Sequence, residues 1–324
     1  MNGFGHQFRL AVWGESHGEA IGVTLDGVPQ GIPLAVEDFE RDLARRRSGS
    51  RGTTPRREKD LPELLSGVYA GRTTGAPLTI VFRNEDCRSG DYAALATHYR
   101  PSHADFVARQ RFAGCNDPRG GGHFSGRLTA LVVAAGVVAK KILPEQIGFH
   151  TAVTEIGGET DPERFDVLLE KATAEGDSLG GVVTACVEGI PVGWGEPFFD
   201  SVESLAAHLL FAIPAVKGVE FGAGFAGAKM SGSEHNDPII DREGHTATNH
   251  AGGVVGGLTN GNPLHVRVAI KPTASIRKTQ MTYNQATDRV DALSIAGRHD
   301  VCIALRAAVV VEAALAIALA DLMR

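Results

Sequence analysis

The stretch from residue 119 to residue 141 reads RGGGHFSGRLTALVVAAGVVAKK and carries two signals for the fold. Its first part, Arg119 followed by three glycines, is typical of a loop whose backbone approaches another group closely. Its second part holds the longest apolar run of the chain, from Leu128 to Ala139 with Thr129 inside, and ends at two lysines. We therefore expect a long helix over about residues 125–143, too short in its apolar part to span a bilayer.

Apolar periodicity predicts further elements on both sides of this helix. Strands are expected over residues 8–13, 21–28, 65–69, 78–82, 152–156, 181–187 and 264–270, with a hairpin around 71–77. Helices are expected over residues 36–47, 104–112, 162–174, 202–211 and 303–323. Strands and helices do not alternate one for one, and the two halves are similar in composition. The sequence thus predicts one α+β domain over residues 1–324 with an internal pseudo-repeat.

Composition and charge exclude several classes of protein. The chain of 324 residues is 43% hydrophobic and 22% charged, so it can bury a sizeable core. Its 32 basic and 38 acidic side chains give a net charge of −6, which disfavours nucleic acid as the main partner. The four cysteines, Cys87, Cys115, Cys186 and Cys302, form no CxxC pair. Free thiols, and an N-terminus without a basic and apolar leader, predict a cytoplasmic protein without a membrane anchor.

Two short motifs match known signatures but lack their structural context. Residues 14–18, GESHG, match the serine nucleophile elbow, which needs a helix directly after the turn. The residues that follow are β-branched and end in a proline turn, which predicts a strand instead. Residues 222–227, GAGFAG, match a dinucleotide fingerprint, yet a breaker-rich loop follows rather than a helix. We expect neither a serine hydrolase nor a dinucleotide-binding fold, and we expect a functional loop over residues 227–263.

Arginines gather in one segment without acidic neighbours. Between residues 45 and 57 the chain has six arginines and no carboxylate: Arg45, Arg46, Arg47, Arg51, Arg56 and Arg57. The planar guanidinium matches phosphate and carboxylate groups, so the segment predicts a site for an anionic small molecule. A solvated basic helix end explains the first three arginines but not those beyond the glycines. Arg119 with its three glycines, and Arg127 after them, give a second anion signal.

Three histidines stand beside small or acidic residues rather than in an apolar stripe. His17, His103 and His299 are candidate general acids, although each alone is more often a structural residue. The segment with His235, Asp237, Asp241, His245 and His250 matches no metal-ligand spacing. We therefore predict no metal site.

The order of nine short blocks resembles the chorismate synthase family. They are GESHG at 14–18, DGVP at 26–29, RRRSG at 45–49, YRPSHAD at 99–105, RGGG at 119–122, VKGVE at 216–220, NHAGG at 249–253, KPT at 271–273 and GRHD at 297–300. The resemblance runs from about residue 5 to the last helix. It implies a β-α-β sandwich of antiparallel sheets that enclose helices, assembled as a homotetramer.

The resemblance also implies the activity. In this family, 5-enolpyruvylshikimate 3-phosphate loses phosphate and a ring proton by net anti-1,4-elimination and gives chorismate, in the shikimate pathway of aromatic amino acid biosynthesis. The implied cofactor is reduced FMN (FMNH2), and the family is also associated with NADP. Because the chain shows no second nucleotide-binding module, we expect an external flavin reductase as the source of reduced flavin.

Residue roles follow from the resemblance, position by position. His17 would protonate the departing phosphate, His103 would protonate or stabilise the reduced flavin, and Asp300 would take the proton from flavin N5. Ser16 and Ser125 would relay protons. The arginines expected to bind substrate are Arg46, Arg51, Arg127 and Arg298, with Arg47, Arg100 and Arg41 as further candidates. The residues expected to contact flavin are His123, Phe124, Ser125, Pro214, Ala215, Gly256, Lys271, Pro272, Thr273, Ala274, Ser275 and Arg298.

Two other functions stay open on the residues alone. A phosphate-ester lyase or hydrolase could use the same arginines without flavin, and a non-catalytic protein could bind polyanions on the basic loop. At His123, Phe124, Pro214 and Val301 the sequence departs from the common family pattern, and Pro214 has no backbone N–H to donate.

Overall fold

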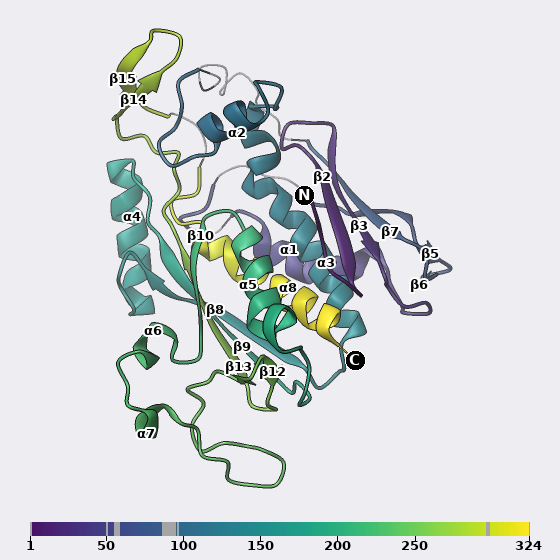
Figure 1. Ribbon diagram of the computed structural model, residues 1–324. Helices are drawn as coiled ribbons and strands as arrows, with labels where there is room; N and C mark the ends of the chain where they lie inside the picture. The colour runs from purple at the N-terminus through teal and green to yellow at the C-terminus, as the bar shows by residue number, and fades with distance from the viewer. Residues whose placement is uncertain are drawn as a thin grey trace.

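Two antiparallel sheets with helices between them build the structure (Figure 1). The computed structural model describes residues 2–49, 51–54, 59–85, 95, 97–295 and 299–323. The first sheet has the strand order β1-β2-β3-β7-β4: β1 Gly3–Phe4, β2 Arg9–Gly14, β3 Ala20–Asp26, β7 Leu78–Arg83 and β4 Glu63–Ser66. The second has the order β10-β13-β9-β8: β10 Val216–Phe221, β13 Leu264–Ile270, β9 Gly181–Glu188 and β8 Gly148–Ile156. All neighbouring strands run antiparallel, which confirms the predicted α+β class.

The helices form a central group and a peripheral group. The central group is α1 Glu40–Arg46, α3 Thr129–Ile142, α5 Val202–Ala212 and α8 Ala304–Leu322. The peripheral group is α2 Asp105–Arg111, α4 Phe165–Glu175, α6 Gly224–Gly227 and α7 Gly232–His235. Three small hairpins complete the fold: β5 Val68–Tyr69 with β6 Arg72–Thr73, β11 Val254–Val255 with β12 Leu258–Thr259, and β14 Gln280–Asn284 with β15 Arg289–Leu293.

The two halves of the chain share one topology. In the first half, β2, β3, α1, β4 and β7 are followed by α3; in the second, β8, β9, α5, β10 and β13 are followed by α8. In the first sheet β7, the last of these four strands along the chain, lies between β3 and β4. In the second sheet β13, also the last of its four, lies between β9 and β10. The predicted pseudo-repeat is therefore present, and α3 and α8 are equivalent elements of its two copies. The 227–263 segment is the insertion between β10 and β13, where the first half has the β5–β6 hairpin.

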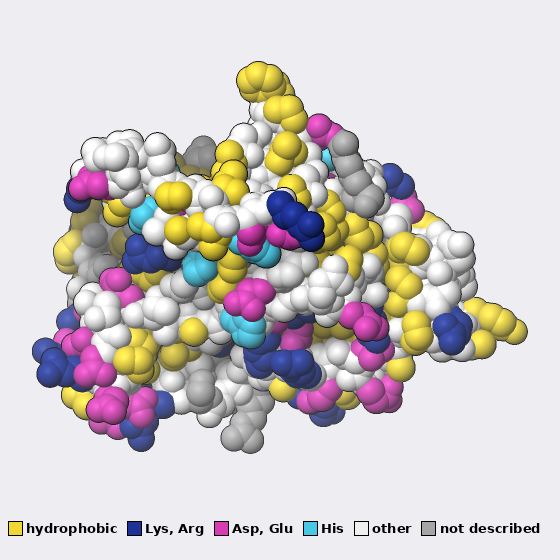
Figure 2. Space-filling view, turned by 90° about the horizontal axis from the view of Figure 1, so that it is seen from below, with side chains coloured by type: hydrophobic (Ala, Val, Ile, Leu, Met, Phe, Trp, Pro, Cys, Tyr) yellow, Lys and Arg dark blue, Asp and Glu magenta, His cyan; other side chains and the backbone are white. Residues whose placement is uncertain are grey.

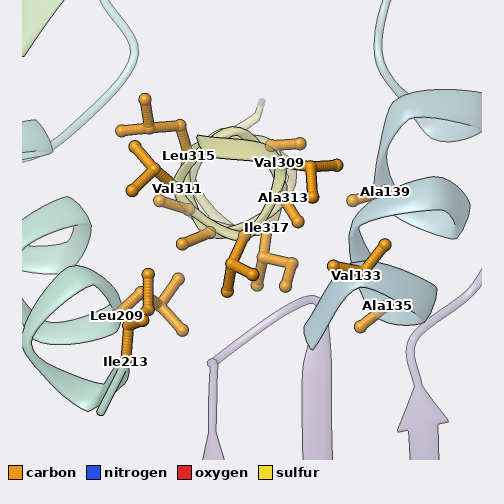
Figure 3. Packing of buried hydrophobic residues seen from close by; sticks show 14 of the residues in the cluster. Val133, Ala135, Ala139, Leu209, Ile213, Val309, Val311, Ala313, Leu315 and Ile317 are labelled. Atoms are coloured by element: carbon orange, nitrogen blue, oxygen red, sulfur yellow. The ribbon is translucent and has the colours of Figure 1, made fainter. Parts of the chain in front are cut away.

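The equivalent helices α3 and α8 pack against each other at the centre (Figure 3). Nearly every residue of α8 is buried, as expected for a helix that is apolar on all sides. At the contact, Gly136 of α3 faces Ala313 of α8. A Cβ at Gly136 would lie under 3.0 Å from both the Cα and the Cβ of Ala313. The absence of a side chain at residue 136 thus lets the two helices approach closely.

A buried ionic cluster fixes α1 to this centre. The carboxylate of Glu312 in α8 accepts hydrogen bonds from Arg45 of α1 (2.7 Å from Nη2), from Lys140 of α3 and from Thr151 of β8 (2.7 Å). Burial would raise the pKa of Glu312, but the hydrogen bond from Arg45 and the charge of Lys140 outweigh it and hold the pKa at about 2. The last turn of α1 is thereby held in place, and the next residue along it is Arg46.

Most of the predicted elements are present, but the strand expected over residues 65–69 is divided at Gly67 into β4 and β5, which belong to different sheets. The long helix is found as a short 3-10 turn, Gly126–Leu128, followed by α3. The turn at residues 14–18 joins β2 to β3, so no helix follows the GESHG motif. The strands β1 and β10 and the hairpins β11–β12 and β14–β15 were not predicted. The strand β10 is only partly buried and contains Gly218, and the hairpin β14–β15 is largely polar, so neither shows a clear period.

No helix in the described ranges is long and apolar enough to cross a membrane.

The contact at Gly136 makes a prediction about stability. We expect Gly136→Ala to lower the free energy of unfolding by about 1–3 kcal/mol, because the added methyl group overpacks the α3–α8 contact. Gly232→Ala is the matched control, since a Cβ there would meet no atom within 4 Å. Denaturant unfolding of both variants measures the difference. If Gly136→Ala were as stable as the control, the α3–α8 contact would have room for a methyl group at residue 136, and the prediction would be wrong.

Candidate active site

A cavity of about 690 Å³ lies against the central helices and reaches both halves of the chain. Its walls come from the N-terminal strands, the end of α1, the glycine-rich stretch before α3, α5, the segment after β13, and α8 with the residues before it. This volume falls within the range of small-molecule and cofactor sites. The cavity has a polar part rich in arginine and an apolar part, and its size leaves room for more than one small ligand.

The polar part is organised by one buried carboxylate. Asp60 is 4% exposed and accepts from two arginines, Arg46 (3.0 Å from Nη1) and Arg127. Burial would raise the pKa of Asp60, but the charges of Arg46 and Arg127 outweigh it and lower the pKa below its ordinary value. All three residues line the cavity. A negative charge shared by two cations leaves a net positive site beside the cavity.

Arg46 and Arg127 differ in how fully their donors are used. Arg46 also donates to Thr129 Oγ1 (3.0 Å) and to two backbone carbonyls. Burial, together with the charge of Arg306, lowers its pKa to about 9, so it stays charged at neutral pH. Arg127 donates through Nε to Asn84 (3.2 Å), whereas its buried Nη2 has no hydrogen-bond partner among the described residues. A buried guanidinium N–H without a partner is costly, and an anionic ligand in the cavity would satisfy it.

Asp300 lies in the same part of the cavity and is held from two sides. Its Oδ1 accepts from the backbone N–H of Thr54 (2.8 Å), and its Oδ2 accepts from Arg306 (3.0 Å). Arg306 also donates to the carbonyl of Arg46 (2.8 Å), so the aspartate and the Asp60 cluster are joined through one side chain. These two donors fix the position of the Asp300 carboxylate.

His103 belongs to a second cluster in the cavity wall. Its Nδ1 lies 2.6 Å from Oδ1 of Asp105, which also accepts from Arg100 (2.6 Å from Nη2). Arg100 donates in turn to the hydroxyl of Ser275 (3.0 Å). Burial and the charge of Arg100 lower the pKa of the neighbouring His299 to about 4, so that imidazole is neutral at pH 7. The cluster thus presents two imidazoles of different environment to the cavity.

The three glycines separate His17 from His103. Gly120, Gly121 and Gly122 all have positive φ, which favours glycine. A Cβ on Gly120 would lie under 3.0 Å from the ring of His17, and a Cβ on Gly121 would lie 3.4 Å from Cε1 of His103. Gly120 lines the cavity, and the buried Ser16 and His17 lie behind it. A side chain at Gly120 would therefore displace His17, whereas a Cβ at Gly121 would make an ordinary contact with His103.

Another part of the cavity lining holds residues expected to contact a flavin. Ser125, Phe124, Pro214 and Ala215 line the cavity, as does the whole segment from Lys271 to Ser275. Burial and the charge of Lys217 lower the pKa of Lys271, so two cations lie close together at this end. The hydroxyl of Thr273 is buried without a hydrogen-bond partner among the residues described. His123 also lines the cavity, but its ring nitrogens contact Gly14 O (2.8 Å) and Asn2 Oδ1 (3.2 Å).

Several expected residues lie elsewhere. Arg51 is exposed and pairs with Asp166 and Glu170 of α4 (3.0 and 2.9 Å), away from the cavity lining. Gly256 lies in the turn between β11 and β12, also outside the lining. Arg47 lines the cavity but pairs with Glu40 (2.7 Å), while Arg41 is exposed on α1. The position of Arg298 lies outside the described residues, as do those of Arg56, Arg57 and Cys87.

Three polar or charged cavity residues were not assigned from the sequence. They are Asp60, Thr54 and Arg306. Asp60 follows the arginine-rich segment without any periodic pattern, and Arg306 lies within the last apolar helix. A charged side chain in an otherwise apolar helix was the one available signal for Arg306.

The histidines of the 231–250 segment form a separate surface feature. His245 pairs with Asp241 (2.7 Å) and His250 with Asp237 (3.2 Å). The face in Figure 2 shows histidines interspersed with acidic, basic and apolar side chains. Within the described part of the chain, no group of three or more potential ligands could hold a metal ion.

Comparison with known proteins gives one consistent family. A protein-family model described as chorismate synthase matches residues 8–323. The chorismate synthase of Chitinophaga pinensis is 59% identical over 323 residues, covering 100% of this chain and 96% of the relative. That of Korarchaeum cryptofilum is 46% identical over 347 residues, covering 98% and 96%. A crystal structure of a chorismate synthase matches with a TM-score of 0.75 at 29% identity, covering 98% of this chain and 92% of that one.

The shared carboxylate gives a testable stability effect. We expect Asp60→Asn to lower the free energy of unfolding by about 3 kcal/mol, because it leaves two buried guanidinium groups without their counter-charge. Asp26→Asn is the control, since Asp26 pairs with Arg9 on the surface and its loss should change stability far less. Thermal unfolding of the two variants decides the matter. Equal losses in both would mean that Asp60 does not hold the arginines together.

Proposed function

Because the chain belongs to the chorismate synthase family, we propose that the cavity described above is its active site. The family is one of carbon–oxygen lyases: 5-enolpyruvylshikimate 3-phosphate loses phosphate and a ring proton and gives chorismate. The observation that best supports the proposal is the Arg46–Asp60–Arg127 cluster, with an N–H of Arg127 buried and without a partner among the described residues. This cluster suits a substrate that carries a phosphate and two carboxylates.

Substrate binding is the first task of the site. Arg46, Arg127 and Arg47 line the polar part of the cavity, and we propose that they bind the phosphate and carboxylate groups. Arg306 adds a fourth cation beside them. Arg298 stays a candidate from the sequence. Arg51 would have to leave its ion pairs with α4 before it could reach a ligand here.

Proton transfer is the second task. We propose that His17 protonates the departing phosphate, with Ser16 and Ser125 relaying protons, because an unprotonated phosphate leaves less readily. Asp300, whose carboxylate is held in place by Thr54 and Arg306, is the proton acceptor on its side of the cavity. His103, when its imidazole is protonated, is a proton donor, and Arg100 connects its cluster to the 271–275 segment.

The cofactor in this proposal is reduced FMN. When bound, it takes part transiently in a reaction that has no net redox change. The fit rests on three features: the room in the cavity, the closely spaced cations Lys271 and Lys217, and the buried Thr273 hydroxyl that lacks a partner among the described residues. Ser125, Phe124, Pro214, Ala215 and the 271–275 segment would hold it, and His123 would contact it through its ring because its nitrogens are engaged. Gly256 does not line this cavity, so this proposal gives it no contact with the cofactor.

Assembly and context complete the proposal. Residues 1–324 act as one domain, since one cluster of buried residues joins both sheets and the central helices. We propose a homotetramer in the cytoplasm, supplied with reduced flavin by an external reductase. The described cysteines, Cys115, Cys186 and Cys302, are free thiols, in keeping with a reducing compartment. The association of the family with NADP then belongs to the reductase step.

The products test the proposed function. With chemically reduced FMN and 5-enolpyruvylshikimate 3-phosphate under anaerobic conditions, we expect phosphate and chorismate to appear in equal amounts, and neither with oxidised FMN. His17→Ala should keep substrate binding and lose turnover by about 10²–10⁴-fold, because it removes the proton donor to the leaving group.

Two outcomes would argue against the proposal. Phosphate without chorismate would indicate a hydrolase that uses the same arginines. Unchanged turnover in His17→Ala would remove His17 from the reaction.

A further inference from the structure

Asp105, at the start of α2, is a carboxylate to which the proposed function gives no role. Its side chain is 9% exposed. It contacts His103, which lines the cavity. Four donors point at its two oxygens. Oδ2 accepts from the backbone N–H of Arg100 (3.1 Å) and from Arg100 Nε (2.7 Å), whereas Oδ1 accepts from Arg100 Nη2 (2.6 Å) and contacts His103 Nδ1 (2.6 Å).

This environment determines the charge of Asp105. Burial would raise its pKa, but the hydrogen bonds from Arg100 and His103 outweigh it and hold the pKa far below its usual range. An ionised carboxylate can only accept hydrogen bonds. The proton in the short contact between Asp105 and His103 therefore belongs to Nδ1 of the histidine. In its neutral form, His103 must be the Nδ1–H tautomer, with Nε2 unprotonated.

The same contact orients the imidazole. With Nδ1 directed at Asp105, the Nε2 edge of the ring lies over Gly121, where a Cβ would be 3.6 Å from Nε2. His103 lines the main cavity and also a small cavity of about 70 Å³ behind it. The charged and titratable neighbours that face it in the described residues are Asp105 and Arg100 from its own segment, His299, and Arg109 and Asp117 across the small cavity.

Arg100 extends this constraint to the 271–275 segment. Its Nη1 donates to the hydroxyl of Ser275, which is 6% exposed and ends the 271–275 segment. Asp105 therefore connects His103, through one guanidinium, to the segment proposed to hold the cofactor. The Arg100 donors named here are engaged with protein groups, so its main role is to hold the carboxylate rather than to bind substrate.

We propose that Asp105 is a positioning residue, which fixes the tautomer of His103, holds its Nε2 edge over Gly121 and connects it through Arg100 to the 271–275 segment. The inference rests on the proposed function only for its catalytic consequence. The tautomer itself follows from the contacts and is observable without turnover. Asparagine at residue 105 could donate as well as accept, so it would permit the other tautomer.

The test combines imidazole nitrogen NMR with kinetics on the full-length protein. The His103 signals are assigned by their absence in His103→Gln and are measured at a pH high enough for the neutral form. We expect Nδ1–H in the wild-type protein and a larger share of Nε2–H in Asp105→Asn. Turnover of Asp105→Asn should fall by about 10²–10⁴-fold with KM changed much less, and Asp105→Glu should recover part of it. Asp26→Asn, a surface carboxylate paired with Arg9, should change neither readout.

The outcomes separate the two claims. An Nε2–H tautomer in the wild-type protein would overturn the proposal even if Asp105→Asn failed to fold. An unchanged tautomer in a folded Asp105→Asn, or a loss confined to KM, would also overturn it. The expected tautomers in a protein that makes no chorismate would leave the positioning role intact and contradict the proposed function instead.

Discussion

The buried carboxylate of Asp60 is the interaction on which the site depends. It accepts from Arg46 at the end of α1 and from Arg127 just before α3, so a single charge joins two elements that are far apart in sequence. Without it, two buried cations would repel each other across the cavity wall. With it, the arginines keep a net positive charge and fixed directions. An anion can then bind without first ordering the residues that receive it.

The repeated topology explains how the charged residues of the cavity wall are held in place. The two copies place α3 and α8 at the centre, and Gly136 lets these helices approach closely. Glu312 of α8 holds Arg45 of α1, next to Arg46, while Arg306 of α8 holds Asp300. The cavity thus takes residues from both copies of the repeat, and Arg306 of α8 contacts both Asp300 and the backbone of Arg46. The long insertion between β10 and β13 supplies none of the residues that line this cavity.

The sequence predicted the parts of the structure that carry local patterns. The length and apolar composition of the run before Lys140 and of the last segment of the chain predict two helices. The arginines without acidic neighbours predict an anion site. Asp60 and Asp105 could not be assigned, because their roles depend on partners that only the fold or a turn brings into contact. The strand β10 escaped detection because Gly218 interrupts a half-exposed strand. Arg51 shows the opposite case: it belongs to the arginine segment, yet its nearest charges are on α4.

We propose that the arginine cluster and the residues that would hold the cofactor belong to one site. The most direct test is an anaerobic titration of the protein with reduced FMN, with and without 5-enolpyruvylshikimate 3-phosphate, repeated on Arg127→Ala. The account predicts that substrate tightens flavin binding in the wild-type protein and that this effect is lost or much reduced in Arg127→Ala. Flavin binding of equal affinity with and without substrate, or no flavin binding by the folded protein, would contradict this proposal.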